Sequence, residues 1–373
     1  MRRRTLSIVH TESSCGWGGQ EIRILTEMEG MVRRGHRLTL ICPLQARIHD
    51  AALARGLDVV ALPIARKNLQ GLFALFRWLL QHRHEVDIVN SHSSTDSWLA
   101  ALALRLLPGS PPLVRTRHVS SPVAQKRSSY WLYQHAVKHL VVTGEALREQ
   151  LHRDNGFALE SMSSVPTGID LARFAPSDRH AARKKLGQPD VPTLGILATL
   201  RNWKGHFYLL EAFALLRATF PDWRLLIIGD GPQRHNLERK VVELGLTNRV
   251  ALVGNQDNVP DWLNALELFA LPSYGDEGVP QSIMQAMACG LPVVSTPVGG
   301  IGEAVVANET GVLVPPKDSH ALSVALGRLM GDQELRARFG AAGYARAQAR
   351  FGSERMLDGM EHIFLRYARS ARQ

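Results

Sequence analysis

Short apolar runs alternate with amphipathic stretches along the whole chain. In the first half, apolar runs bounded by turn residues predict six strands: Leu6–His10, Leu38–Cys42, Val59–Leu62, Ile88–His92, Leu113–Arg117 and Leu140–Thr143. Stretches with the apolar spacing of helices lie between them, for example Gln20–Arg34, Leu69–His82, Thr95–Leu107 and Glu145–Asn155. Strands that alternate with helices form βαβ units, so we expect a mainly parallel sheet covered by helices on both faces.

The turn residues of Val165–Asp170 interrupt this pattern, and the polar stretch Ala175–Pro192 reads as a linker with a short helix. A second series follows. Its strands are expected at Leu194–Thr199, Trp223–Gly229, Val250–Val253, Leu268–Leu271, Pro292–Thr296 and Gly311–Val314. Its helices are expected at Phe207–Phe220, Asn236–Leu244, Val259–Ala265, Gln281–Ala288, Gly302–Val306 and Ser319–Met330.

The two series predict an α/β protein with two doubly wound, Rossmann-like domains that face a central cleft. We assign residues 1–172 to the first domain and residues 173–352 to the second. The C-terminal helix, within residues 353–373, is amphipathic and is expected to pack back on the first domain. Ligands of such domains bind at the carboxyl ends of the parallel strands.

Composition limits the classes of protein that fit. The chain has 373 residues, 45% hydrophobic and 21% charged, which is ordinary for a globular protein. Three widely spaced cysteines favour a reducing compartment. The N-terminus lacks the apolar core of a signal peptide, and Trp98–Leu107, the most apolar segment, is too short to span a bilayer. We expect a cytoplasmic protein.

The net charge of +10 is concentrated in the first half. Residues 1–180 contain 23 Lys and Arg against 15 Asp and Glu, a net of +8, and the remainder carries +2. Such a half suits an anionic membrane surface, where each basic residue contributes about 1 kcal/mol, or an anionic acceptor. It is also compatible with a solvated surface that has no partner. No nucleic-acid motif accompanies the charge, so we expect no nucleic-acid partner.

Two loops of the second series carry groups that suit a phosphate and a sugar. Arg201 and Lys204 follow its first strand and precede a helix, a place where cations and backbone N–H groups can hold a diphosphate. Further on, the segment from Glu277 to Pro280 precedes another helix, and its carboxylate can accept hydrogen bonds from sugar hydroxyls. Gln285, about two turns on from Glu277 and near the same face of that helix, can bind a ribose diol. Together the loops suit a nucleotide sugar, although a surface turn at Lys204 is the commoner arrangement.

The first domain offers a glycine-rich turn and two histidines. Gly18 and Gly19 follow the first strand and open a helix, so a ligand can approach the backbone closely there, as can an ordinary turn. His92 and His118 fall at strand ends, where a ligand site is expected, although a single histidine is more often structural. Arg117, beside His118, and Thr167, in the interrupting turn, are further candidates on the acceptor side.

Several other activities lose their usual support. The sequence contains no Asp-x-Asp pair for a metal-bound diphosphate, no phosphate-binding P-loop, no Gly-x-Ser-x-Gly elbow and no HExxH. Simple hydrolase, kinase and dehydrogenase functions are therefore disfavoured.

The motifs resemble those of the retaining glycosyltransferases of family four, of the group 1 type, which have the two-domain GT-B fold. The resemblance spans nearly the whole chain and depends on the order of its motifs. These are Gly18-Gly19, Thr116-Arg-His118, Val165-Pro-Thr-Gly-Ile-Asp170, Trp203-Lys-Gly205, Ile228-Gly-Asp-Gly-Pro232, Glu277-Gly278, Ala286–Val294 and Gly299-Gly300.

The resemblance implies a role for each matching residue. Lys204 would hold the donor diphosphate with Gly19, Glu277 would contact the donor sugar, and His118 would lie beside that sugar. Asp230 and Gly231 would lie near the nucleotide base. The resemblance further implies transfer with retention of the anomeric configuration and without a metal or other cofactor.

The chain departs from the family pattern at three positions. Gln285 replaces the second of the usual pair of glutamates, and Thr199 replaces an arginine whose role Arg201 is expected to take. Thr167 stands where the family usually has serine or asparagine.

We therefore expect a hexosyltransferase that moves a sugar from a nucleotide-diphosphate sugar to a cell-envelope glycan or glycolipid, such as lipopolysaccharide core. We further expect it to work at the inner face of the membrane, in peripheral contact with anionic lipid. Three alternatives stay open: a nucleotide-sugar epimerase on the same scaffold, a phosphorylase, for which the chain is short, and a non-catalytic module that binds nucleotide sugars.

Overall fold

The chain forms two compact units in a computed structural model that describes residues 4–275 and 277–369. The first unit comprises the described residues of Met1–Gly168 and Ser353–Gln373, and the second comprises Ile169–Gly352. The chain therefore passes between units four residues before the expected boundary at 172/173 and returns where we expected it. Residues 370–373 of the expected C-terminal segment lie outside the described part. The cleft expected between the domains stays a prediction.

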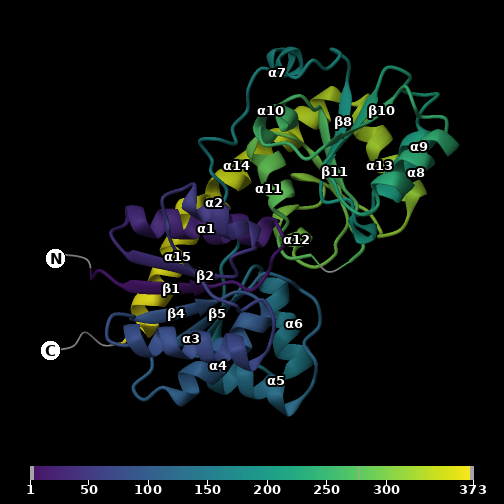
Figure 1. The fold of residues 1–373 in the computed structure, drawn as a ribbon. Coiled ribbons are helices and arrows are strands. Elements are labelled where there is room, and N and C mark those ends of the chain that lie inside the picture. Colours follow the sequence, from purple (N-terminus) through teal and green to yellow (C-terminus); the bar gives the residue numbers. More distant parts are fainter. Residues whose placement is uncertain (1–3, 276, 370–373) are drawn as a thin grey trace. The chain divides into compact units, whose positions relative to one another are not determined.

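The first unit is built on a parallel sheet of seven strands in the order β3-β2-β1-β4-β5-β6-β7 (Figure 1). Its strands are β1 (Ser7–Thr11), β2 (Arg37–Cys42), β3 (Asp58–Ala61), β4 (Ile88–Ser91), β5 (Leu113–Arg117), β6 (His139–Val142) and β7 (Met162–Ser164). The order reverses direction at β1 and β4, which is where a doubly wound sheet places its ligand. The edge strand β7 was not predicted, because three residues are too few to show an apolar pattern.

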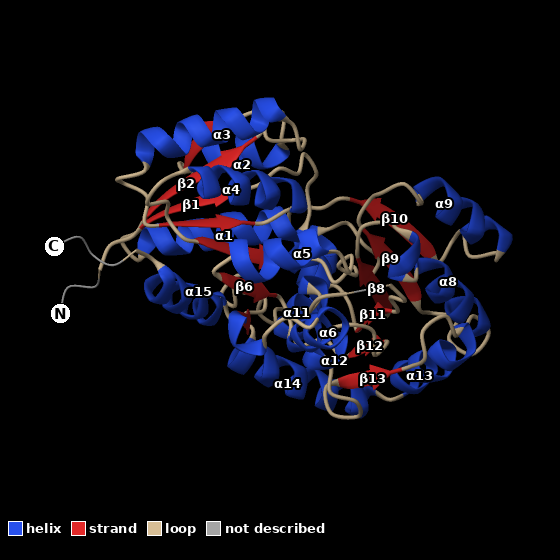
Figure 2. Cartoon of the chain, turned by 90° about the horizontal axis from the view of Figure 1, so that it is seen from below, coloured by secondary structure: helices blue, strands red, loops and turns tan. Residues whose placement is uncertain are grey.

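Helices cover both faces of this sheet (Figure 2). On one face, apolar side chains of α1 (Gly19–Arg33), α2 (Arg47–Leu53) and α15 (Ser353–Tyr367) form a single core with the strands. On the other face, α3 (Leu69–His82), α4 (Ser94–Leu106) and α6 (Glu145–Asn155) form a second core. The C-terminal helix packs on the first unit, as expected, and Leu357 and Phe364 are fully buried there. Three short elements complete the unit: α5 (Arg127–Trp131), the π-helical turn η1 (Leu132–Ala136) and the 3-10 turn η2 (Leu159–Ser161).

The second unit contains a parallel sheet of six strands in the order β10-β9-β8-β11-β12-β13. The strands are β8 (Thr193–Leu197), β9 (Arg224–Ile228), β10 (Val250–Gly254), β11 (Leu268–Leu271), β12 (Val293–Ser295) and β13 (Gly311–Leu313). All six were predicted to within a few residues, because buried parallel strands are apolar on both faces and are bounded by turns. The unit shares one hydrophobic core.

The helices of the second unit follow the predicted alternation, with one omission. They are α7 (Arg179–Lys185), the 3-10 turn η3 (Asn202–Lys204), α8 (His206–Leu215), α9 (Arg234–Glu243), α10 (Val259–Asn264), α11 (Gln281–Ala288), α12 (Ile301–Ala304), α13 (Ser319–Gly331) and α14 (Gln333–Arg350). Two predicted helices were wrong in extent: the one expected to reach Phe220 ends at Leu215, and the one expected at Gly302–Val306 is the four-residue α12.

The 18-residue helix α14 was missed altogether. It packs through small residues as well as through Leu335 and Phe339, and so it shows no broad apolar stripe. At Gly340, a Cβ would lie 2.2 Å from the carbonyl oxygen of Gly290. The helix therefore approaches backbone so closely that only glycine fits, a kind of contact that hydrophobic periodicity does not reveal.

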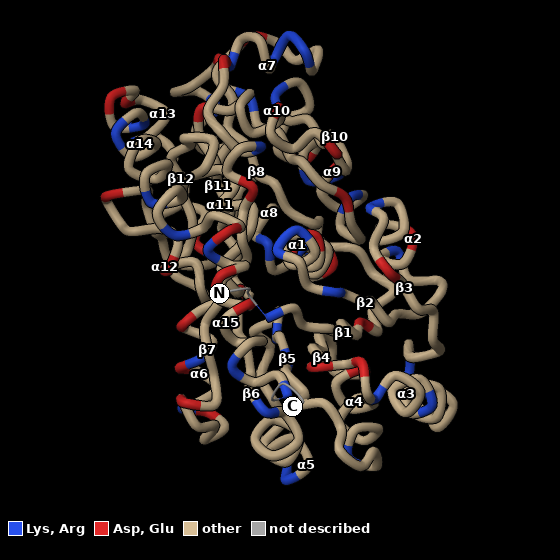
Figure 3. Tube along the Cα trace, turned by 90° about the vertical axis from the view of Figure 1, so that its left-hand side faces the viewer, with Lys and Arg blue, Asp and Glu red and all other residues tan. Residues whose placement is uncertain are grey.

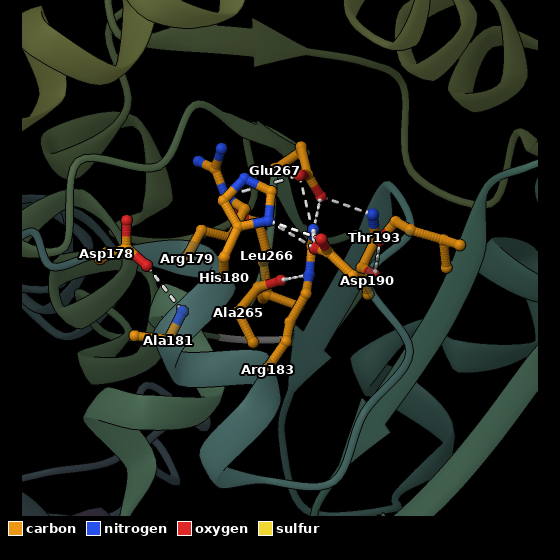
Figure 4. Close-up of polar contacts among 11 residues, drawn as sticks. Asp178, Arg179, His180, Ala181, Arg183, Asp190, Thr193, Ala265, Leu266 and Glu267 are labelled. Carbon is orange, nitrogen blue, oxygen red and sulfur yellow. Dashed lines mark hydrogen bonds and ion pairs between the residues drawn. The ribbon is translucent and has the colours of Figure 1, made fainter.

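A buried arginine fixes the linker helix α7 to the sheet of the second unit (Figure 4). Arg183 donates to both carboxylate oxygens of Glu267, at 2.6 Å for Oε1, and to the carbonyl oxygen of Ala265 at 3.0 Å. A second carboxylate, that of Asp190, accepts from Arg183 at 3.0 Å, and Glu267 also accepts from the backbone N–H of Thr193. The paired charges bind the linker to the first residues of β8 and β11.

Among residues 4–275 and 277–369, no helix is both long and apolar enough to cross a membrane.

Candidate functional site

The donor-side candidates lie at one edge of the second sheet, where its parallel strands end. Lys204 is in η3, just after β8, and Asp230 follows β9. Glu277 lies in the loop after β11, and Gly299 in the loop after β12. Loops at the carboxyl ends of neighbouring parallel strands meet, so residues about 95 positions apart in the chain lie together. The sequence prediction that these loops share one edge agrees with this arrangement.

An ion pair joins the two residues predicted to act on the donor. Lys204 Nζ lies 2.6 Å from Oε1 and 2.9 Å from Oε2 of Glu277. Glu277 is 8% exposed, and its Oε1 also accepts from the hydroxyl of Ser273 at 2.7 Å. Both side chains are therefore held in place before any ligand arrives, which is the condition for preorganised electrostatic stabilisation.

Two glycines after β12 hold the backbone of Glu277. The N–H of Gly300 donates to the carbonyl oxygen of Glu277 at 2.9 Å. Gly299 has a φ of +56°, and a Cβ there would lie 2.0 Å from the same oxygen. A side chain would strain the backbone and displace the loop, so the pair Gly299-Gly300 serves to position Glu277.

The other donor-side candidates differ in burial and in the contacts that they make. Arg201 stacks over the ring of Trp203 at 5.2 Å, and the Asp230 carboxylate accepts from the N–H of Gly231 at 2.7 Å. Val279 is buried in the core of the unit and Gln285 is half-buried on α11. Gly278 and Pro280 continue the chain from Glu277 to α11, with Pro280 at its N-cap. Their predicted contacts with a nucleotide sugar stay predictions.

In the first unit, both predicted histidines belong to a hydrogen-bonded row. His118 Nε2 lies 2.9 Å from His92 Nδ1, and His92 Nε2 lies 2.8 Å from Nδ1 of His10 in β1. Burial lowers the pKa of His10 to about 3 and those of His92 and His118 well below the usual value. All three imidazoles are therefore neutral near pH 7.

The remaining candidates of the first unit make internal contacts. Arg117 is buried and donates to the hydroxyl of Tyr133 at 2.8 Å and to the carbonyl oxygen of Ser121. Thr167, also buried, accepts from Arg23 at 3.3 Å. These contacts stabilise loops, and the expected contacts of Arg117 and Thr167 with an acceptor stay predictions.

Gly18 is the N-cap of α1, and Gly19 is the first residue of that helix. The backbone of Gly18 is extended, and a Cβ there would meet only Glu21 Oε2, at 3.8 Å. No described neighbour therefore requires glycine at this position, and the predicted contact of Gly18 and Gly19 with a donor stays a prediction.

A pocket of about 530 Å³ opens in the first unit at the carboxyl ends of its strands. Five of its nine lining residues carry a hydroxyl group, and one carries a positive charge. The lining residues are Ser13, Ser14, Cys15, Gln45, Ala65, Arg66, Ser93, Ser94 and Thr95. Beside it, Lys67 donates to Ser94 Oγ at 3.2 Å.

Two buried acids lie behind the serines of this pocket. Asp96 accepts from the hydroxyls of Thr11 and Ser13, each at 2.9 Å. Glu12 accepts from the Ser93 hydroxyl at 2.6 Å, and burial, with the charge of Asp96, raises the pKa of Glu12 to about 8. The acids thus fix the hydroxyls of Ser13 and Ser93, two residues of the pocket lining.

Sequence reasoning missed Glu12, Asp96 and His10. Each lies on or beside a buried strand or helix start, in a stretch that reads as ordinary structure. The one available signal was the placement of His10, His92 and His118 near the ends of three strands, which the sheet order brings side by side. For metals, no cluster of three or more His, Cys, Asp or Glu side chains with ligand spacing occurs among the described residues.

Two family models match successive parts of the chain. The model described as "Glycosyltransferase Family 4" matches residues 17–173, and "Glycosyl transferases group 1" matches residues 178–346. Among curated proteins, the chain is 30% identical over 250 residues to the lipopolysaccharide core biosynthesis mannosyltransferase LpsB of Rhizobium meliloti, covering 65% of this chain and 70% of LpsB. It is 27% identical to an Escherichia coli UDP-Gal:alpha-D-GlcNAc-diphosphoundecaprenol alpha-1,3-galactosyltransferase, covering 88% and 89%.

Solved structures with the same fold include glycosyltransferases. A glycosyltransferase from Rickettsia africae superimposes with a TM-score of 0.87 at 18% identity, covering 97% of this chain and 98% of the other. HepE of Anabaena, solved in complex with UDP, superimposes with a TM-score of 0.86 at 22% identity, covering 97% and 100%. At these identities the likeness establishes the fold.

Proposed function

The chain belongs to the group 1 glycosyltransferases of family 4, and from this premise we propose that it is a retaining, metal-independent hexosyltransferase. Its donor is a nucleotide-diphosphate sugar and its acceptor a cell-envelope glycan or glycolipid, such as lipopolysaccharide core. The family membership supports the reaction class, and the curated relative from Rhizobium meliloti supports the class of acceptor.

The observation that carries the proposal is the ion pair of Lys204 and Glu277. It brings one cation and one carboxylate together at the carboxyl edge of a Rossmann-like sheet. The cation suits a diphosphate, and the carboxylate suits sugar hydroxyls. A nucleotide sugar carries both kinds of group and so matches the pair.

In the proposed reaction, the bond between the anomeric carbon and the diphosphate breaks and negative charge collects on the leaving phosphate. Lys204 Nζ stabilises that charge, assisted by the N-terminus of α11, which the loop of Glu277 leads into. Glu277 accepts hydrogen bonds from the donor sugar and orients it. As the resemblance implies, His118 is proposed to contact the donor sugar, and we assign no covalent nucleophile.

Thermal unfolding with nucleotide sugars tests this proposal. We expect one of UDP-glucose, UDP-galactose, GDP-mannose and ADP-glucose to raise the unfolding temperature in the presence of EDTA. A ligand at 100 times its Kd stabilises the folded state by about 2.7 kcal/mol. Lys204→Ala should lose that increase, whereas Lys138→Ala, which changes an exposed lysine of the first unit, should keep it. If none of the donors stabilises the protein, or if stabilisation requires a divalent metal, the proposal is wrong as stated.

The hydroxyl-rich pocket of the first unit supports the acceptor side of the proposal. Its serine and threonine hydroxyls can exchange hydrogen bonds with a glycan, and the exposed guanidinium of Arg66 suits an anionic group on the acceptor. This is the chemistry of a charged core oligosaccharide.

We expect Arg66→Ala to raise KM for a lipopolysaccharide core oligosaccharide about tenfold, with kcat and the donor KM nearly unchanged. Loss of one exposed, charged hydrogen bond is worth about 1.5 kcal/mol, which corresponds to that factor. Arg77→Ala, an exposed arginine on α3 outside the pocket lining, is the matched control. Equal acceptor KM values in the two variants would place the acceptor elsewhere.

Product analysis with and without acceptor separates the alternatives. An epimerase would convert its donor without acceptor, a phosphorylase would require inorganic phosphate, and a binding module would give no product.

A further inference from the structure

The imidazoles of His10, His92 and His118 form a continuous row from the interior of the first unit to its carboxyl edge. The rings of His10 and His92 are nearly parallel, at 10°, and those of His92 and His118 are inclined by 31°. Ring nitrogens 2.8 and 2.9 Å apart join them. His10 and His92 are buried, whereas His118, at the outer end, is half-buried.

The register of the parallel sheet produces this row. His10 lies opposite Asn90 on the neighbouring strand β4, and His92 is two residues beyond Asn90. Ser91 lies opposite Arg115 on β5. In the same register Thr116 is the position opposite His92, and His118 is two residues beyond Thr116. A shift of two residues keeps a side chain on the same face of a sheet. The row therefore runs diagonally on one face of the sheet, from β1 to the residues that follow the adjacent strands β4 and β5.

The inner end of the row faces a buried carboxylate on α1. His10 Nε2 lies 3.8 Å from Glu27 Oε1, and Glu27 Oε2 lies 3.9 Å from Nε of Arg23. Both side chains of this pair are fully buried. Figure 3 shows acidic and basic positions together along α1. The edge of the Phe364 ring packs against His10 from α15.

A neutral imidazole carries one N–H, so one ring nitrogen donates and the other accepts. Within a row of neutral rings, every N–H must therefore point in the same direction. In the inward order, His118 donates from Nε2 to His92, His92 donates to His10, and the N–H of His10 faces Glu27. His118 then presents Nδ1 as a bare acceptor. In the outward order all donors reverse and His118 Nδ1 carries the proton.

We infer that Glu27, acting through His10 and His92, sets the tautomer of His118. An ionised Glu27 attracts the N–H of His10 and repels a ring lone pair, so it selects the inward order. His118 then accepts a hydrogen bond, as from a sugar hydroxyl, through Nδ1. A protonated Glu27 instead donates toward His10 and allows the outward order. Glu27, His10 and His92 are thus positioning residues for the group at His118.

The switch falls near neutral pH. Burial raises the pKa of Glu27 to about 7, against the opposing effect of Arg23. The three histidines stay neutral over this range. Arg23 on α1 and Arg115 on β5 also act on the row and stay cationic, and the Asp96 carboxylate on α4 accepts from the backbone N–H of His92 at 2.9 Å. As pH falls through about 7, Glu27 gains a proton and the inward order is lost. His118 should then change from acceptor to donor without becoming charged.

Imidazole ¹⁵N spectra of the full-length protein labelled at histidine test the inference, because bare and protonated ring nitrogens resonate far apart. At pH 8 we expect wild-type His118 to show a protonated Nε2 and a bare Nδ1. Glu27→Gln, whose amide donates toward His10, should move His118 toward the opposite tautomer, two imidazoles away. The control is Glu29→Gln on the same helix, which removes a half-buried carboxylate paired with Arg55 at 3.3 Å. If both variants leave His118 unchanged, the row is only structural and the inference fails.

A titration of the wild type from pH 6 to 8.5 tests the same linkage and does not depend on whether a variant folds. All three histidines should change tautomer with one shared midpoint near 7. In His92→Phe, which interrupts the row, His118 should lose that midpoint. Independent midpoints, or none, would overturn the inference.

The catalytic consequence rests on the proposed function, and the spectra do not. With an active donor and acceptor, the acidic limb of kcat should have a midpoint near 7 in the wild type and disappear in Glu27→Gln. If His118→Ala retains full turnover while the tautomer still follows Glu27, the proposed role of His118 is wrong and the linkage stands. If the His118 tautomer does not change with Glu27 while His118→Ala is inactive, the linkage is wrong and the proposed role of His118 stands.

Discussion

Replacing Lys204 by alanine is expected to lower kcat by about 10²-fold or more. The leaving diphosphate gains charge in the transition state, and the loss of one preorganised donor to such a charge costs about this factor. Lys204 is suited to the role because Glu277 holds its ammonium at 2.6 Å before the donor binds. Initial rates at saturating donor and acceptor give kcat directly.

The expected loss must be separated from a loss of folding. Without Lys204, Glu277 is left as a mostly buried carboxylate. A fully buried pair that loses one partner costs about 3–5 kcal/mol. The cost should be smaller here, because the Lys204 side chain is 20% exposed and Ser273 still donates to Glu277. Thermal unfolding of the variant measures this directly. Lys138→Ala, which changes an exposed lysine of the first unit, should keep a normal kcat. Near-normal turnover of Lys204→Ala would refute its role.

Replacing Glu277 by alanine is expected to abolish most transfer, with a loss comparable to that in Lys204→Ala. The variant removes the proposed acceptor of hydrogen bonds from the sugar hydroxyls and also the partner that fixes Lys204. Glu277→Gln keeps the size and part of the hydrogen bonding but removes the charge. Its residual rate therefore shows how much of the loss comes from the carboxylate charge.

The double variant gives a second readout. Because the two side chains are in contact, their effects on kcat should combine to less than the product of the single losses. Independent, multiplicative losses would show that the ion pair does not position either group. An active Glu277→Ala would move the contact with the sugar to another residue.

Much of the fold could be predicted because its physical basis is local in the chain. Strands such as Leu268–Leu271 are apolar throughout and end at turns, which distinguishes them from the amphipathic helices between them. The apolar pattern does not reveal α14, because this helix packs most closely through Gly340, against the backbone of Gly290. That contact depends on two segments 50 residues apart, and neither segment signals it alone.

The candidate site, like the fold, could be predicted only in part. Loops after parallel strands were expected to carry Lys204, Glu277 and the paired glycines, because the alternation of strands and helices places every such loop at one edge. The ion pair itself, and the need for glycine at position 299 against the carbonyl of Glu277, follow from how the loops after β8, β11 and β12 meet.

The sequence by itself determined the fold class, the family and the loops that carry the candidate site residues. These depend on hydrophobic periodicity and on short motifs, which are local in the chain. Tertiary structure alone decided that His10, His92 and His118 form one row ending at Glu27, and that serines from two loops share a pocket. Such arrangements depend on strand order and register, which bring together side chains such as those of His10 and His92, 82 residues apart, through contacts that no local pattern encodes.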